Sequence, residues 1–144
     1  AMVNFRMLSG TVGRLWTSSV AIGRQHGFDI QVFGEKGGLK WISEQPNQLL
    51  YSKIGSRTEI IEKGENNLYD DASRLSRVAI AHPEGFPLAV ANIYVDIAAT
   101  INGDVRANLP TAADGLRSMA AVYAATESAR NTGKWVDARP PMFR

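Results

Sequence analysis

Residues 3–62 alternate apolar and polar side chains in short runs, which is the spacing of half-buried β-strands. The positions that share one face within each run are Val3, Phe5 and Met7; Trp16, Ser18, Val20 and Ile22; Phe28, Ile30 and Val32; Leu39 and Trp41; Leu49 and Tyr51; and Thr58 and Ile60. Short turns separate the runs, among them Gly34–Gly38 and Gln45–Asn47. Parallel strands would need long crossovers, so the pattern predicts an antiparallel meander of six strands.

The second half of the chain follows a helical period instead. Residues 64–85 are mixed and predict at most a short helix near residues 70–75. An apolar stripe at helical spacing then predicts a long helix that starts at Phe86 and ends at an Asn-Gly pair. A second long helix starts at a capping box, in which the Thr111 hydroxyl and the Asp114 carboxylate serve the free amides of its first turn.

Strands that come first and helices that follow indicate an α+β fold. We expect an open antiparallel sheet of about six strands, followed by two long helices packed on one face. With 144 residues and 44% apolar content, the chain is long enough to form a single domain over residues 1–144.

Composition narrows the classes of partner. The net charge is +2 and the basic residues are scattered, whereas a nucleic-acid binder usually has a concentrated basic stripe, so we expect no nucleic-acid partner. No apolar run approaches the roughly 20 residues that a membrane span needs, and we expect no membrane partner. The sequence has no cysteine, which removes disulfides and thiolate chemistry. We expect no secretory leader and a cytoplasmic location.

A search for motifs of catalysis is negative. The sequence has no G-x-G-x-x-G dinucleotide fingerprint, no phosphate-binding P-loop and no G-x-S-x-G elbow. Its two histidines, His26 and His82, lie far apart and lack the companion residues of a zinc site. We therefore assign no catalytic, cofactor-binding or metal-binding residue to this chain.

Two polar stretches contain more candidate ligand-binding side chains than a purely structural connection needs. In the first, Arg24 and His26 can hydrogen-bond hydroxyls or a carboxylate of a ligand, and Phe28 can supply an apolar wall. The alternative is a solvated hairpin loop, which the residues alone favour. The second stretch, residues 82–86, includes His82. Its alternative is a helix entry shaped by Pro and Gly, and this too is favoured by the residues alone.

The order of several motifs resembles the Gfo/Idh/MocA oxidoreductases, a family that includes glucose–fructose oxidoreductase and inositol dehydrogenase. Residues 28–39 (FDIQVFGEKGGL) resemble the family's strand, turn and strand. Residues 82–86 (HPEGF) with 91–96 (ANIYVD) are similar to its next helix entry. Residues 109–117 (LPTAADGLR) are similar to its last long helix, and 133–136 (GKWV) to its closing strand.

The resemblance implies the C-terminal domain of a two-domain enzyme, in which an N-terminal Rossmann domain binds NAD(P) and the C-terminal α+β domain covers the substrate. The family's catalytic lysine lies in an E-K-P motif, and its Asp/His pair lies on a helix before the region matched here. Both are absent, and Glu35-Lys36 is followed by Gly37 in a hairpin turn, so it is not that motif. We expect a truncated enzyme that lacks the Rossmann domain and is inactive alone.

The resemblance also assigns roles to the polar stretches. It implies that His26 and Phe28 contact the substrate with Arg24 behind them, and that His82 is a further candidate. The expected activity of the complete enzyme is NAD(P)-dependent oxidation of a CH–OH group of a sugar or inositol-like polyol. One alternative is a free-standing dimeric binding module that shares the fold without catalysis. Another is a gene fragment without function.

We expect a homo-oligomer, at least a dimer, formed through the open face of the sheet. Two helices can cover one face of a six-stranded sheet but not both, and the strands carry apolar groups on both sides. A large exposed apolar surface usually marks a partner site. The resemblance agrees, because relatives form dimers and tetramers through this face. The alternative is that the Rossmann domain or residues 64–85 cover it.

Overall fold

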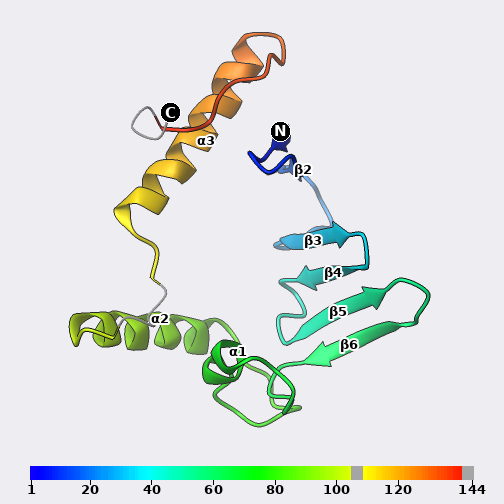
Figure 1. Cartoon of the computed structure of the whole chain (residues 1–144), viewed down its shortest axis with the longest axis vertical. Coiled ribbons are helices and arrows are strands. Elements are labelled where there is room, and N and C mark those ends of the chain that lie inside the picture. The colour runs from blue at the N-terminus through cyan, green and yellow to red at the C-terminus, as the bar shows by residue number, and fades with distance from the viewer. Residues whose placement is uncertain (105–108, 141–144) are drawn as a thin grey trace. The chain divides into compact units, whose positions relative to one another are not determined.

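The computed structural model describes residues 1–104 and 109–140 and shows strands followed by helices (Figure 1). The chain divides into two compact units, one comprising Ile22–Ala107 and the other Ala1–Ala21 with Asn108–Arg144. Each unit is described by itself below.

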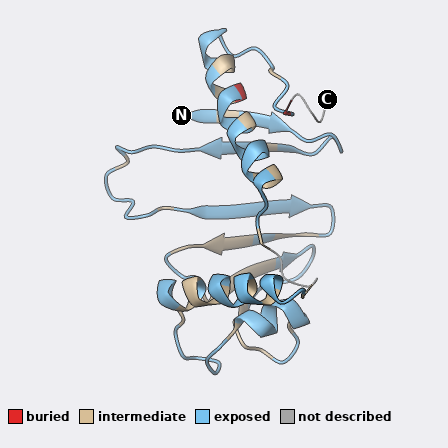
Figure 2. Cartoon of the chain, turned by 90° about the vertical axis from the view of Figure 1, so that its left-hand side faces the viewer, coloured by how far each residue is buried: buried red, intermediate tan, exposed pale blue. Residues whose placement is uncertain are grey.

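The first unit is built on a four-stranded antiparallel sheet of β3 (Asp29–Gly34), β4 (Gly37–Ile42), β5 (Gln48–Lys53) and β6 (Thr58–Glu62). The strands lie side by side in chain order, and each hairpin joins neighbours (Figure 1). The inner strands β4 and β5 carry most of the intermediate burial in this sheet, whereas β3 is exposed along its length (Figure 2). Consecutive pairing through short turns is the meander that the sequence predicts.

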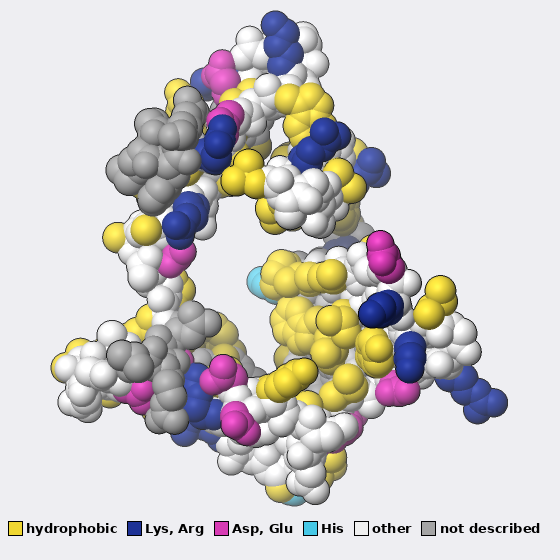
Figure 3. Space-filling model, viewed as in Figure 1, with side chains coloured by type: hydrophobic (Ala, Val, Ile, Leu, Met, Phe, Trp, Pro, Cys, Tyr) yellow, Lys and Arg dark blue, Asp and Glu magenta, His cyan; other side chains and the backbone are white. Residues whose placement is uncertain are grey.

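The register gives the sheet two unlike faces, because residues opposite each other in neighbouring strands share a face. One face, called the apolar face below, carries Ile30, Val32, Leu39, Trp41, Leu49, Tyr51 and Ile61. On the other face apolar residues such as Phe33 and Leu50 alternate with polar ones such as Lys40 and Gln48. Hydrophobic side chains gather visibly over β3–β5 (Figure 3).

Two helices complete this unit: α1 (Asp70–Leu75) and α2 (Phe86–Ile101). A proline in the first turn of α2 costs no hydrogen bond, because the first N–H groups of a helix have no partner within it. The guanidinium of Arg74 lies 2.7 Å from the Asp96 carboxylate, and the Asn92 amide donates to the Leu75 carbonyl at 3.0 Å. Polar contacts thus hold α1 against α2.

The second unit holds the hairpin of β1 (Met2–Arg6) and β2 (Val12–Trp16) and the helix α3 (Ala112–Arg130). The expected capping box is present, since the Asp114 N–H donates to the Thr111 hydroxyl at 3.3 Å and the Thr111 N–H donates to the Asp114 carboxylate at 2.9 Å. The Arg6 guanidinium lies 5.6 Å from the ring centre of Trp135, which ties β1 to the segment after α3.

The prediction of an α+β fold with antiparallel strands and two long helices is confirmed. In detail, the strands form a four-stranded and a two-stranded sheet rather than one sheet of six. The expected strand face from Trp16 to Ile22 ends at Trp16, and the loop that follows contains Gly23 at φ +94°. Residues 133–136 are not a strand.

Candidate functional site

Three segments with polar side chains meet at one end of the four-stranded sheet. In an antiparallel meander the start of β3, the β4–β5 turn and the end of β6 lie at the same end, as the pairs Asp29–Ile42 and Gln48–Glu62 show. The loop of residues 22–28, the turn of residues 43–47 and the segment after Glu62 are therefore neighbours. This end contains all four candidate residues from the sequence.

The loop of residues 22–28, called the His26 loop below, is tied to the β4–β5 turn. The Gly27 N–H donates to Oε1 of Glu44 at 2.6 Å, and the Ser43 N–H donates to the Phe28 carbonyl at 2.9 Å. The Gly27 N–H bond is the main reason why the pKa of Glu44 lies below its ordinary value, and the N–H of Glu44 itself, the Ser43 hydroxyl and the His26 N–H add to the effect. Glu44 gave no signal in the sequence because it is an isolated acidic residue in a turn.

The side chains of the His26 loop differ in how firmly they are held. The ring of Phe28 packs edge-on against Trp41, with centroids 5.9 Å apart and planes at 74°. Arg24 lies 4.0 Å from Asp29 in an exposed ion pair, which contributes little to stability. His26 is exposed. Phe28 is thus a fixed apolar wall at one margin of the apolar face, while His26 and Arg24 reach into solvent.

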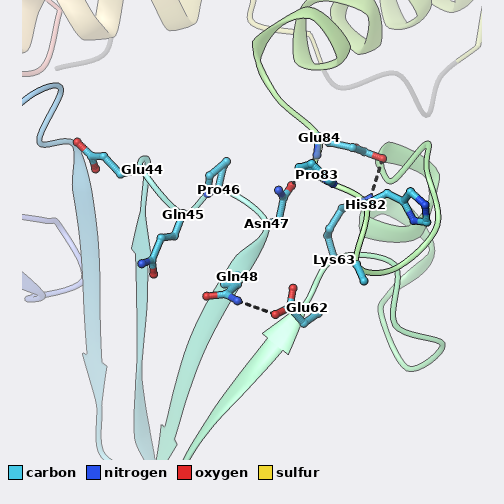
Figure 4. Close-up of a pocket in the computed structure, with 11 residues that line it drawn as sticks. Glu44, Gln45, Pro46, Asn47, Gln48, Glu62, Lys63, His82, Pro83 and Glu84 are labelled. Carbon is cyan, nitrogen blue, oxygen red and sulfur yellow. Dashed lines mark hydrogen bonds and ion pairs between the residues drawn. The ribbon is translucent and has the colours of Figure 1, made fainter.

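On the other side of the turn lies a pocket of about 490 Å³. Figure 4 shows its polar walls, and the amide of Gln48 donates to Glu62 at 2.6 Å across two strands. The residues that line it are Glu44, Gln45, Pro46, Asn47, Gln48, Glu62, Lys63, Ala81, His82, Pro83 and Glu84. Amides and carboxylates of this kind can hydrogen-bond a hydroxylated ligand.

An ion pair between Lys63 and Glu84 fixes the wall of this pocket. Their charged atoms are 3.1 Å apart, and each side chain is only 12% exposed. Oε1 of Glu84 also accepts the N–H groups of Arg77 and Val78, both at 2.5 Å. Burial raises the pKa of Glu84, but the bonds from Val78, Lys63 and Arg77 outweigh it, so that the pKa lies below its ordinary value.

His82 lines the same pocket but directs its ring elsewhere. Nδ1 lies 3.2 Å from the Ile80 carbonyl, and because a carbonyl oxygen only accepts, Nδ1 carries the proton in this contact. In Figure 4 the ring points away from Asn47 and Gln48. The structure therefore brings His82 to the pocket that Glu44 also lines, while His26 lies outside it.

The described residues hold no group of three or more His, Cys, Asp or Glu side chains that could bind a metal ion. Within the same residues, no helix is both long and apolar enough to cross a membrane. The amides and carboxylates at this end of the sheet can hydrogen-bond hydroxyl groups, and the Phe28 ring can pack against the apolar face of a ring.

Known proteins are similar to this chain in sequence and fold. Residues 1–137 match the family described as the oxidoreductase family, C-terminal alpha/beta domain. The chain is 34% identical over 98 residues, 68% of its length, to 25% of the uncharacterized oxidoreductase YfiI of Bacillus subtilis (strain 168). An oxidoreductase from Sinorhizobium meliloti matches at a TM-score of 0.87 and 35% identity, over 94% of this chain and 40% of that one. An inositol dehydrogenase homolog from Azotobacter vinelandii, complexed with NADH and myo-inositol, matches at 0.87 and 31%, over 93% and 38%.

The chain therefore belongs to the Gfo/Idh/MocA family of oxidoreductases and corresponds to their C-terminal alpha/beta domain. The resemblance inferred from the order of the motifs is confirmed. The chain spans between 25% and 40% of the length of these relatives.

Proposed function

We propose that this chain is the substrate-binding and oligomerisation domain of a cytoplasmic, NAD(P)-dependent dehydrogenase that oxidises a CH–OH group of a sugar or inositol-like polyol. An N-terminal Rossmann domain would supply the cofactor site in the complete protein, and residues 1–144 would form the second domain. The observation that carries the proposal is the match over 93% of the chain to an inositol dehydrogenase homolog complexed with NADH and myo-inositol.

The end of the sheet described above supplies the substrate contacts in this proposal. Phe28, held edge-on by Trp41, offers a flat apolar wall to the C–H face of a ring, and His26 offers a hydrogen bond to a hydroxyl. Arg24 stands behind them, next to Asp29. His82 is the least supported of the four, because its Nδ1 contacts the Ile80 carbonyl.

The apolar face favours a second candidate function, a free-standing dimeric binding module without catalysis. Such a module would need the oligomer interface and no cofactor. The two functions differ in what precedes this domain in the gene product. A Rossmann fingerprint and an E-K-P motif upstream would establish the dehydrogenase.

The chain alone should bind neither NAD nor NADP. The described residues carry no glycine-rich turn that opens a helix, so backbone amides for a pyrophosphate are missing. Calorimetric titration of the 144-residue chain with each dinucleotide at sub-millimolar concentration should show no heat of binding. A clear binding isotherm would contradict the proposal that the cofactor site lies in a separate N-terminal domain.

In the complete protein, His26→Ala and Phe28→Ala should each reduce kcat/KM for the sugar or polyol several-fold. The loss of one positioned hydrogen bond costs about 0.5–1.5 kcal/mol, and loss of the aromatic wall has a similar magnitude. Lys53→Ala is the control, because Lys53 ends β5 opposite Gly37, at the other end of the same sheet. Steady-state kinetics of the folded variants measures kcat/KM. An unchanged kcat/KM in both His26→Ala and Phe28→Ala would mean that the loop is a solvated connection without a role in substrate binding.

A further inference from the structure

We infer that Glu44 is a positioning residue for the substrate, because its carboxylate fixes the His26 loop and with it the position of His26 relative to Phe28. The inference rests on the proposed function, in which these two residues contact a sugar or polyol. Glu44 itself does not need to touch the substrate.

The His26 loop depends on the β4–β5 turn for its position. The Ser43 N–H holds the Phe28 carbonyl at 2.9 Å, which fixes only the end of the loop that enters β3. The bond from the Gly27 N–H to Glu44 at 2.6 Å is the next tie back along the chain. Within residues 1–104 and 109–140, no other hydrogen bond joins residues 22–27 to the sheet. Without the Glu44 carboxylate, residues 22–27 would keep only the exposed Arg24–Asp29 ion pair as a tie to β3, and the loop would move more freely.

The backbone at Gly27 is shaped for this bond. Its φ of +67° is a conformation that L side chains rarely adopt, and a Cβ there would lie 3.2 Å from the Arg24 Cβ. The positive φ of Gly27 and the Glu44 carboxylate together hold this part of the loop against the β4–β5 turn.

The carboxylate also stands between the two candidate regions. Glu44 holds the His26 loop on one side and lines the pocket of His82 on the other. Asn47, at the end of the same turn, accepts the Lys63 N–H at its carbonyl at 2.9 Å. The β4–β5 turn thus sets the position of the His26 loop relative to the pocket. A ring substrate that contacts both would depend on this relative position.

The test uses Glu44→Ala and Glu44→Gln, with Glu35→Ala as the matched control. Glu35 lies in the β3–β4 turn, at the opposite end of the same sheet, and its replacement removes the same charge. In the complete protein, Glu44→Ala should raise KM for the polyol about ten-fold, near the lower end of the effect of losing one charge-assisted hydrogen bond. Its kcat should stay within about two-fold, because no reacting group is removed. Glu44→Gln should be milder, since an amide oxygen still accepts, and Glu35→Ala should change neither constant.

A second readout reports the bond itself. In NMR spectra of the 144-residue chain, the Gly27 amide signal should move with pH at a midpoint below the ordinary value for glutamate. Glu44→Gln should abolish this movement and Glu35→Ala should preserve it. A Gly27 signal that does not titrate, or a KM unchanged in Glu44→Ala while the enzyme oxidises the polyol, overturns the inference alone. A complete protein that oxidises no sugar or polyol while Gly27 still titrates overturns the proposed function, and with it the positioning role.

Discussion

Replacing Glu84 with glutamine should lower the free energy of unfolding by about 2 kcal/mol, because it leaves a largely buried ammonium without its counter-charge. Lys63 would keep its bond to the Val78 carbonyl at 2.8 Å but lose the carboxylate 3.1 Å away. The N–H groups of Arg77 and Val78 would share one neutral acceptor in place of the charged one. Urea denaturation followed by circular dichroism measures the loss.

Glu59→Gln is the matched control for this prediction. It makes the same chemical change on β6, at an exposed residue whose opposite neighbour is Tyr51. Its effect should stay within about 0.5 kcal/mol, as for most surface substitutions. Equal losses in both variants would mean that the ion pair contributes nothing particular to stability.

The Lys63–Glu84 ion pair also makes the stability of the fold depend on pH in the acid range. Because the pKa of Glu84 in the folded chain lies below its ordinary value of 4.5, the folded state binds this proton less readily than the unfolded state. The stabilisation that the Glu84 carboxylate provides is fully present at pH values above the ordinary pKa of 4.5. It is lost as the pH falls through the lowered pKa of the folded state. The difference in stability between the wild-type chain and Glu84→Gln should therefore shrink on acidification below pH 4.5.

Self-association through the apolar face should disappear in Val32→Lys and persist in Gln31→Lys. The two residues are neighbours on β3 and point to opposite faces, so each variant adds the same charge to a different side of the sheet. Val32 is 56% exposed, and a lysine there would place a charge among Ile30, Leu39 and Tyr51 in the paired surface. A symmetric pair of such faces is the simplest way to bury them.

Light scattering at micromolar concentration measures the outcome. The wild-type chain and Gln31→Lys should have a mass above the 15.7 kDa of one chain, and Val32→Lys should have that mass. A wild-type chain that is strictly monomeric would contradict the prediction. It would indicate that another part of the complete protein covers the apolar face. Loss of association in Gln31→Lys as well would place the interface elsewhere.

The sequence predicted the elements of this fold better than their assembly. The spacing of apolar residues located β3–β6 and the starts of α2 and α3, because local periodicity and capping residues determine them. It did not locate the end of β2, since Val20 and Ile22 continue the alternation beyond Trp16 although the chain leaves the strand there. The division into two sheets arises because the consecutive strands β2 and β3 do not pair, and the spacing of apolar residues does not encode which strands pair.

The candidate site was predicted only in part, for a similar reason. Arg24, His26, Phe28 and His82 stood out by residue type, and the antiparallel order of the strands places them at one end of the sheet. Glu44 did not stand out, because its role comes from a contact across 17 residues of sequence. The Lys63–Glu84 pair spans 21 residues, and nothing in either local sequence distinguishes it from a surface ion pair.

The arrangement of the four-stranded sheet also offers a place for attaching a probe. Strands of six residues separate the end with the polar segments from the β3–β4 turn by about 20 Å. Glu35 and Lys36 in that turn are exposed. A fluorophore on a cysteine at position 35 would be a unique label on the 144-residue chain, because these residues include no cysteine. It would allow ligand binding and subunit exchange to be followed optically without disturbing the end where both polar loops lie.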